Sequence, residues 1–237
     1  MRAVVMVSAV VLAAAVLSGC KSTSSAPNAP ANVGAGQQTS AASGATPQSP
    51  LTGSAALQVL SQLPIKAAGS MNGYSRDQFG SAWTDDNNAP GGHNKCDTRD
   101  DILRRDLVDV KPATGCQIES GTLHDVYTGK SIDFVRGPKS SVVQIDHMVP
   151  LGNAWITGAQ GLAADKRKDL ANDPRNLEAV DGPTNEAKGD SDAAAWLPPQ
   201  QSYRCTYVER QVNVKQIYGL WVTQAEHDAM ANLLKSC

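Results

Sequence analysis

The sequence has few aromatic residues, and none of them lies near the N-terminus. All eleven Trp, Tyr and Phe residues lie at Tyr74 or later, and residues 21–52 are mainly Ser, Ala, Pro, Gly, Gln and Asn. Such a segment cannot bury enough apolar surface to offset the entropy lost on ordering. We therefore predict a disordered tether over residues 20–52 and one globular domain over residues 53–237, long enough for a core of ordinary size.

The chain also lacks a hydrophobic run of comfortable membrane-spanning length near its start. The apolar run from Ala3 to Leu17 follows the single charge of Arg2 and ends too early. It predicts an export signal over residues 1–19. The run ends at Leu17-Ser18-Gly19-Cys20, which is similar to a bacterial lipobox, so we expect Cys20 to be lipidated and to anchor the protein to the outer face of the cell membrane. The alternatives are an ordinary secretory peptide and an uncleaved anchor.

There is no excess of positive charge. The chain has 21 Lys and Arg against 23 Asp and Glu, and loss of residues 1–19 removes only Arg2, which leaves 20 against 23, or −3. This balance argues against a tight, nonspecific nucleic-acid binder. A local basic surface remains possible around Lys166-Arg167-Lys168, Arg175 and Lys188, although residues 166–168 fit a solvated helix face equally well.

Cysteine is scarce but even in number once Cys20 is set aside. The four others are expected to be oxidised in an exported chain, with three possible pairings. We favour Cys96–Cys116 and Cys205–Cys237, because each closes a local loop and contributes about 2–4 kcal/mol. A rival interpretation is a metal site formed by His93, Cys96 and Cys116, which lacks the second close ligand pair that thiolate zinc sites usually show.

The periodicity predicts an α+β fold. Leu57, Leu60 and Leu63 are spaced as in a short helix before Pro64. Two segments rich in β-branched and aromatic residues are expected to form a hairpin or small sheet. The expected helices span 97–106, 163–170, 203–218 and 224–234, the last with a Thr223 capping box, and the hairpin strands span 116–123 and 126–135.

A second pair of strands carries the polar residues of most interest. Residues 142–145 form a strand that delivers Asp146 and His147, and residues 177–180 are short enough to be its partner. A helix is then expected to begin near Asn185, capped by Thr184. Neighbouring residues on a regular strand face opposite sides, so Asp146 and His147 converge only if the strand bends, as Pro150 and Gly152 would allow.

These side chains suit hydrolysis of a phosphodiester. A neutral histidine such as His147 takes a proton from water near neutral pH. An ion of the magnesium class needs only one or two protein oxygens, which Asp146 and Asn185 offer. Lys188, one turn after Asn185, is expected to approach the phosphate.

The order Asp-His-x-x-Pro, then Asn176, then Asn-x-x-Lys-Gly-Asp resembles the HNH nucleases with a ββα-metal fold. In detail it resembles their exported actinobacterial branch, related to the C-terminal domain of GmrSD-type restriction enzymes. The resemblance runs from about Tyr74 to Cys237. It includes Cys-Asp-Thr-Arg from Cys96, Tyr-Thr-Gly from Tyr127, Trp-Leu-Pro-Pro from Trp196, and the closing cysteine.

The resemblance implies a role for each residue of the site. His147 is the general base, Asp146 and Asn185 hold the metal, and Asn176 braces the loop between the strands. The resemblance assigns no role to Asp190, which its place in the sequence allows to be either a supporting group or a solvated helix charge. Because Asn185 stands where other HNH enzymes carry a histidine, Mg²⁺ or Mn²⁺ is favoured over Zn²⁺.

The leading hypothesis is a monomeric, lipid-anchored, extracytoplasmic HNH endonuclease that cleaves nucleic acid, DNA rather than RNA. It would have a ββα-metal core with an added N-terminal hairpin, C-terminal helices and two disulfides. A second hypothesis is a surface lipoprotein that keeps the nuclease scaffold only to bind an envelope ligand or partner. The acidic balance favours this reading, and the complete Asp, His, Asn, Asn set disfavours it. A third is a phosphodiesterase acting on a small nucleotide or lipid head group.

Overall fold

The computed structural model describes residues 51–237, which fall within one compact unit. The export signal (1–19), the lipid site at Cys20 and nearly all of the tether (20–52) lie outside these residues. Within the described part, no helix is both long and apolar enough to cross a membrane.

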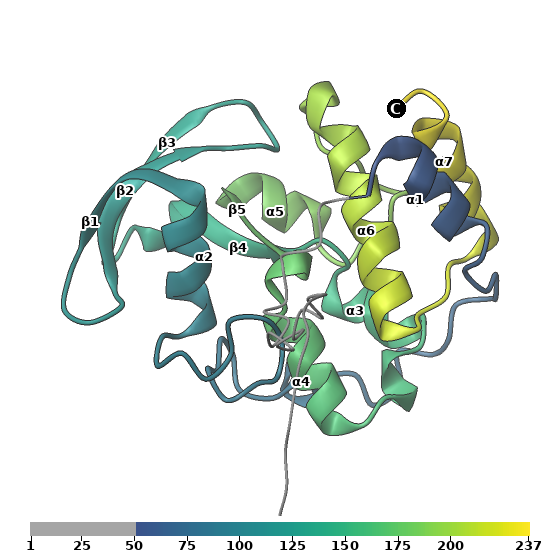
Figure 1. The fold of residues 1–237 in the computed structure, drawn as a ribbon, viewed down its shortest axis with the longest axis horizontal. Coiled ribbons are helices and arrows are strands. Elements are labelled where there is room, and N and C mark those ends of the chain that lie inside the picture. The colour runs from purple at the N-terminus through teal and green to yellow at the C-terminus, as the bar shows by residue number, and fades with distance from the viewer. Residues whose placement is uncertain (1–50) are drawn as a thin grey trace, which may run out of the picture. The chain divides into compact units, whose positions relative to one another are not determined.

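The domain is α+β, with seven α-helices and five strands among residues 51–237 (Figure 1). The elements are α1 (Gly53–Leu60), α2 (Thr98–Asp106), β1 (Leu107–Pro112), β2 (Ile118–His124), β3 (Ser131–Val135), β4 (Val143–His147), α3 (Leu151–Ile156), α4 (Ala164–Asn172), β5 (Leu177–Asp181), α5 (Gly182–Lys188), α6 (Arg204–Tyr218) and α7 (Gln224–Leu234). The helices expected from periodicity are confirmed, and α3 is an additional short helix.

The first sheet has three antiparallel strands in the order β1-β2-β3, which agrees with the predicted hairpin or small sheet and adds strand β1 to it. The expected strand from Val126 begins only at Ser131, because Asp125 holds the preceding residues in a turn. Its carboxylate accepts hydrogen bonds from the backbone N–H groups of Tyr127 and Thr128. Helix α2 packs against this sheet through Ile102 and Leu103, which share a buried cluster with Phe134. The helix is capped by Asp97, whose side chain accepts from the N–H of Asp100.

The second sheet pairs β4 with β5 in antiparallel register, so that Val143 lies opposite Asp181 and His147 opposite Leu177. Between them the chain runs through α3 and α4. Directly after β5, helix α5 contacts both strands. The order strand, strand, helix predicted from the sequence is therefore present.

Helix α5 begins three residues earlier than predicted. Its N-cap is Asp181, whose carboxylate accepts from the N–H of Thr184 at 3.0 Å, so Thr184 is not the cap. Asn185 consequently lies inside the helix. A Cβ on Gly182 would lie 2.3 Å from the Ser141 carbonyl oxygen, so the start of the helix approaches the chain before β4 very closely.

A helical layer of α1, α6 and α7 completes the domain (Figure 1). Leu60, Val208 and Met230 contribute one buried side chain from each helix to a shared apolar cluster. Helix α7 starts at the predicted cap, with Thr223 accepting from the N–H of Glu226. Met148 and Val180, from the two-stranded sheet region, belong to the same cluster, so the helical layer packs against this side of the β4-β5 sheet.

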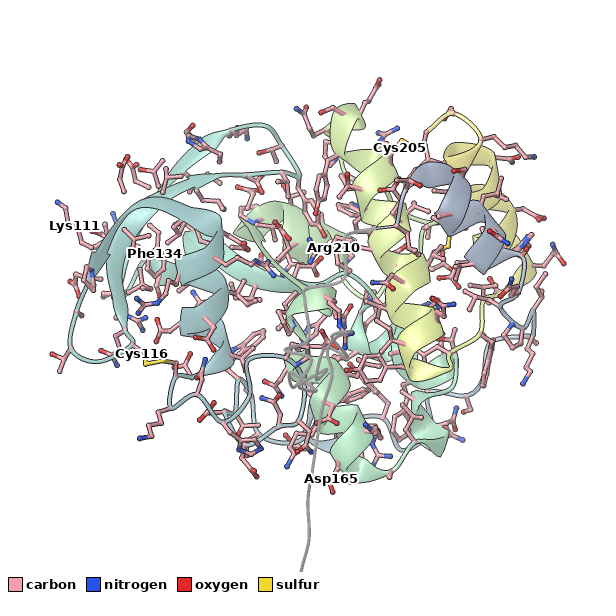
Figure 2. The ribbon with its side chains drawn as sticks, viewed as in Figure 1. Lys111, Cys116, Phe134, Asp165, Cys205 and Arg210 are labelled. Carbon is pink, nitrogen blue, oxygen red and sulfur yellow. A yellow bond between two sulfur atoms is a disulfide. The ribbon has the colours of Figure 1, made fainter. Side chains whose placement is uncertain are left out.

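The four cysteines form the two favoured disulfides, Cys96–Cys116 and Cys205–Cys237. The first ties the segment before α2 to the start of β2. The second ties the start of α6 to the C-terminus (Figure 2). Both thiols of the rival zinc interpretation are consumed in the first bridge, so a thiolate site with His93 is wrong.

Candidate active site

The ends of β4 and α5 border a cavity of about 240 Å³. Its lining brings together Asp146, His147, Asn185 and Asp190, which are up to 44 positions apart in the chain. The remaining lining residues are Arg76, Gln144, Ile145, Pro150, Leu151, Glu186 and Gly189. Three of the four residues expected to do chemistry therefore share one cavity.

The two carboxylate oxygens of Asp146 have different surroundings. Its Oδ2 accepts hydrogen bonds from the Tyr127 hydroxyl and from the Lys188 ammonium, the latter at 2.6 Å. Its Oδ1 accepts no hydrogen bond from any residue between 51 and 237. The side chain is nearly buried, at 5% exposed. One oxygen is thus fixed by the protein, and the other accepts no hydrogen bond from the described residues, in a side chain that lines the cavity.

Lys188 does not take the expected place beside the phosphate. It is 1% exposed and does not line the cavity. Its Nζ donates to Asp146 and, at 2.7 Å, to the carbonyl oxygen of His147. It also lies 5.9 Å and 5.7 Å from the ring centroids of Trp196 and Tyr207. Burial lowers the pKa of Lys188, and the charge of Asp146 opposes this change. Lys188 therefore orients the carboxylate from behind.

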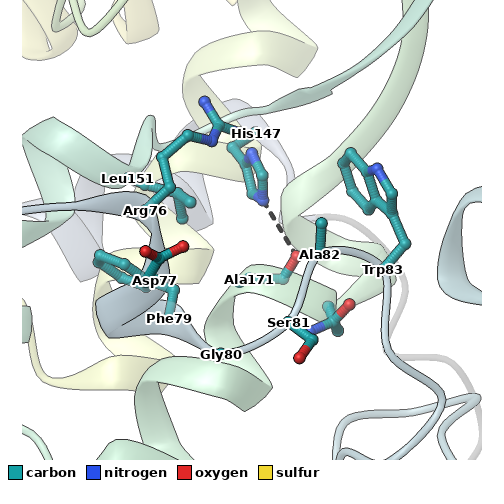
Figure 3. Close-up of a pocket in the computed structure, with 11 residues that line it drawn as sticks. Arg76, Asp77, Phe79, Gly80, Ser81, Ala82, Trp83, His147, Leu151 and Ala171 are labelled. Atoms are coloured by element: carbon teal, nitrogen blue, oxygen red, sulfur yellow. Dashed lines mark hydrogen bonds between the residues drawn. The ribbon is translucent and has the colours of Figure 1, made fainter.

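The imidazole of His147 is held in one orientation. Its Nε2 lies 3.0 Å from the carbonyl oxygen of Ala171, as the dashed line in Figure 3 shows. A carbonyl only accepts, so Nε2 carries the hydrogen and Nδ1 is left as a proton acceptor. The ring stacks on Trp83, with centroids 5.7 Å apart and planes 11° apart.

Burial lowers the pKa of His147 to about 3, and the nearby charges of Arg76 and Lys188 act in the same direction. The hydrogen bond to the Ala171 carbonyl raises the pKa, with an effect smaller than that of burial but larger than that of either charge. The imidazole is therefore neutral across the physiological range, which is the state that a general base requires.

Asn185 lines the same cavity, and its side-chain amide is engaged on one side only. Its Nδ2 donates to the Gln144 side-chain oxygen at 2.9 Å. Gln144 in turn donates to Glu186 at 2.8 Å, which fixes the orientation of both amides. Across residues 51–237 no donor engages Asn185 Oδ1. The amide is thus arranged with its acceptor side unused.

Asn176 and Asp190 both hold backbone near the site. Asn176 is fully buried, accepts from the Val149 N–H at 2.8 Å and donates to the carbonyls of Val149 and Leu170. It ties the end of β4 to α4, as expected of a brace. Asp190 accepts from the Gly152 N–H at 3.0 Å and also lines the cavity, so it supports the start of α3 rather than being a free solvated charge.

The other basic residues considered from the sequence are engaged elsewhere. Lys166 pairs with Asp169, Lys168 with Asp86 and Arg175 with Asp173. Arg99 donates to the Val143 carbonyl at 3.1 Å, which is a structural contact at the start of β4.

Sequence reasoning missed Arg76 and Trp83, which both approach His147 (Figure 3). They lie more than 60 positions before it, in a segment without a recognisable motif. Tyr127 was recognised only as part of the Tyr-Thr-Gly sequence of the family resemblance. Its position in the sequence did not indicate a hydrogen bond to Asp146.

The donor set contains one carboxylate and one amide. Accordingly, in the described range there is no group of three or more His, Cys, Asp and Glu side chains that would hold a metal ion. Two hard oxygens do suit an ion that keeps most of its own water.

Taken together, the fold and the cavity describe an α+β domain with a neutral histidine, a carboxylate and an amide at one site. The chain belongs to the family of GmrSD restriction endonuclease C-terminal domains, whose model matches residues 97–233. This confirms the resemblance drawn from the sequence, and the family's description suggests a nuclease-like function. An "Uncharacterized secreted protein" of Arthroderma benhamiae (strain ATCC MYA-4681 / CBS 112371) is 38% identical over 194 residues, covering 81% of this chain and 89% of that protein. No solved structure matches the chain.

Proposed function

We propose that the protein is a divalent-metal-dependent endonuclease that hydrolyses phosphodiester bonds of nucleic acid. One observation supports this most strongly: a neutral, oriented His147 lines the same cavity as Asp146 and Asn185, each of which has one side-chain oxygen that accepts no hydrogen bond from residues 51–237. A base and two hard oxygen donors are the groups that one-metal phosphodiester hydrolysis needs.

The metal would be held by Asp146 Oδ1 and Asn185 Oδ1. Oxygen donors suit Mg²⁺ or Mn²⁺ better than Zn²⁺, which favours nitrogen and sulfur. When bound, the ion would neutralise charge on the phosphate and assist the leaving oxygen. The Tyr127 and Lys188 bonds to Oδ2 would hold the carboxylate in place and leave its other oxygen for the ion.

His147 would take the proton of the attacking water at Nδ1. The Ala171 carbonyl would keep the Nε2 hydrogen in place during this step. A phosphate arriving beside the ring would raise the pKa of His147, because an anion stabilises the imidazolium. The base would thus become stronger when substrate binds.

The proposed location is outside the cytoplasm, anchored by a lipid on Cys20. Three observations support it: the apolar run and lipobox-like sequence within residues 1–20, the two disulfides, and the secreted relative. We propose DNA as the preferred substrate and a monomer as the active form.

The experiment is incubation of the full-length protein with plasmid DNA and with RNA under Mg²⁺, Mn²⁺, Zn²⁺ or chelator. The proposal expects cleavage with Mg²⁺ or Mn²⁺, faster on DNA, and none with chelator. Cleavage that persists in chelator would remove the metal from the account. Absence of cleavage with every ion, in a folded protein, would favour the binding-only hypothesis.

A further inference from the structure

A second, smaller cavity of about 80 Å³ adjoins the first. The two share Arg76, His147 and Leu151 in their linings, so these residues mark the boundary between them. Arg76 opens a 3-10 helix, Arg76–Phe79, and its side chain extends toward His147 (Figure 3). The arginine therefore stands at the junction of the two cavities, beside the proposed base.

Arg76 differs from every other arginine in the described residues. The others each bind a carboxylate or a backbone carbonyl, as Arg136 does with Asp100 and Arg104 with the carbonyl of Cys116. Over residues 51–237, Arg76 is the arginine with neither a hydrogen bond nor an ion pair. Its five donors are consequently free for a ligand.

The charges around the larger cavity make this arginine important. Three carboxylates line it, on Asp146, Glu186 and Asp190, and Arg76 is the cationic residue among its lining residues. Lys188 is buried against Asp146 and presents no charge to the cavity. A phosphodiester entering this space meets repulsion from the carboxylates, which a cation at the rim offsets.

The segment that follows Arg76 is fixed by several contacts. Phe79 is 1% exposed and packs against Trp155, with ring centroids 6.3 Å apart. Arg167 donates to the carbonyl of Gln78 at 2.7 Å. Trp83, with φ of 56°, adopts a backbone conformation that costs a bulky residue energy, and this places its ring against His147. Arg76 is thus held by a preorganised support.

We infer that Arg76 binds the non-bridging oxygens of the substrate phosphodiester at the junction of the two cavities, the role that the sequence assigned to Lys188. This inference rests on the proposed function and names its phosphate-binding residue. Arg76 lies before the residues matched by the family model, 97–233, so the contact comes from a part of the chain which that model does not describe. A guanidinium suits the task because its fork matches two phosphate oxygens.

The test is binding of a fluorescein-labelled DNA oligonucleotide to the full-length protein in chelator, measured by anisotropy at several salt concentrations. Arg76→Ala should weaken binding about tenfold and reduce the slope of log K against log salt by about 0.7–0.9. Arg76→Lys should restore the slope, because it keeps the charge, and recover only part of the affinity. Lys111→Ala on β1 removes the same charge from an exposed site on the three-stranded sheet and should leave both values unchanged (Figure 2).

The inference is overturned if Arg76→Ala binds like the unaltered protein, or if Lys111→Ala weakens binding equally. Unchanged circular dichroism of each variant ensures that a loss reports the contact and not the fold. Failure of the proposed function is recognised by a separate measurement: the unaltered protein then cleaves no nucleic acid with any metal. Binding by the unaltered protein that Arg76→Ala abolishes would still support the contact in that case, whereas absence of binding by both would overturn the contact as well.

Discussion

Lys188 and Asp146 show how a single side chain can prepare another for chemistry. Both are nearly buried, and their charged atoms lie 2.6 Å apart. A buried ion pair stabilises the fold weakly in total, because desolvation consumes most of the attraction, but removal of one partner leaves an uncompensated charge. The pair is therefore best understood as a device that holds one carboxylate oxygen still.

Lys188→Met should destabilise the protein by about 3–5 kcal/mol, since it strands the Asp146 carboxylate in a buried site. Asp146→Asn in the same chain should recover a large part of that loss. Urea unfolding of the two single variants and the double variant measures the coupling. Lys166→Met, which removes an exposed lysine that lies 3.4 Å from the Asp169 carboxylate, should cost about 0–1 kcal/mol, because water screens the lysine charge. Equal losses for Lys188 and Lys166 would contradict the account.

Some residues of the site were predictable, but Arg76, Trp83 and the direction of Lys188 were not. The Asp-His pair and the later Asn and Lys could be chosen because their chemistry and order fit one reaction. Asn185 and Lys188 are three residues apart, which on a helix of 3.6 residues per turn leaves them about 60° apart in direction. With the helix starting at Gly182, this offset turns Asn185 to the cavity and Lys188 toward the core.

At the scale of elements, the site depends on how closely α5 approaches the start of β4. Gly182 permits that approach because a side chain there would overlap the carbonyl of Ser141. Asn185 reaches the cavity only while the helix stays docked, and its bond to Gln144 on β4 depends on the same distance.

Gly182→Ala should displace the start of α5 and lower cleavage activity about tenfold or more, although alanine ordinarily favours a helix by about 1 kcal/mol. Gly161→Ala, where an added Cβ meets nothing within 4 Å, is the matched control and should be neutral. Initial rates and melting temperatures of both variants decide the matter. If Gly182→Ala were as active and as stable as the control variant, the close approach of α5 to β4 would not be required for activity.

Two elements escaped prediction for physical reasons. Strand β1 follows α2 with no intervening turn, so no Gly or Pro marks its start. Asp109 interrupts the strand with φ of 51°, so the sequence shows no regular alternation of polar and apolar residues there. Helix α3 has only six residues and forms because Trp155 and Leu151 are buried against other segments. Tertiary packing of this kind leaves little trace in local periodicity.

At the scale of the whole molecule, the two disulfides act on different parts of the domain. Cys96–Cys116 fastens the region of α2 and the three-stranded sheet, and Cys205–Cys237 fastens the helical layer. Their pairing was predictable, since local loops are the economical choice for four cysteines. The helical layer that Cys205–Cys237 fastens covers the β4-β5 sheet, so this bridge supports the site indirectly.

Cys205→Ser with Cys237→Ser should lower the free energy of unfolding by about 2–4 kcal/mol, because the unfolded chain regains the freedom of a loop of some 30 residues. For a domain of this size, each kcal/mol lowers the melting temperature by about 2–4 °C. Calorimetry of the variant beside the unaltered protein provides the value. An unchanged melting temperature would show that the bridge does not stabilise the fold.

The most direct test of the central claim is the rate of metal-dependent DNA cleavage by His147→Ala. Loss of the base should lower the rate about 10²–10⁴-fold, while the protein remains folded with a melting temperature a few degrees lower, because the buried ring also packs on Trp83. His124→Ala, at an exposed histidine on β2, should cleave at the unaltered rate. A folded His147→Ala protein that cleaves within a few-fold of the unaltered rate would contradict the claim that this imidazole activates the water.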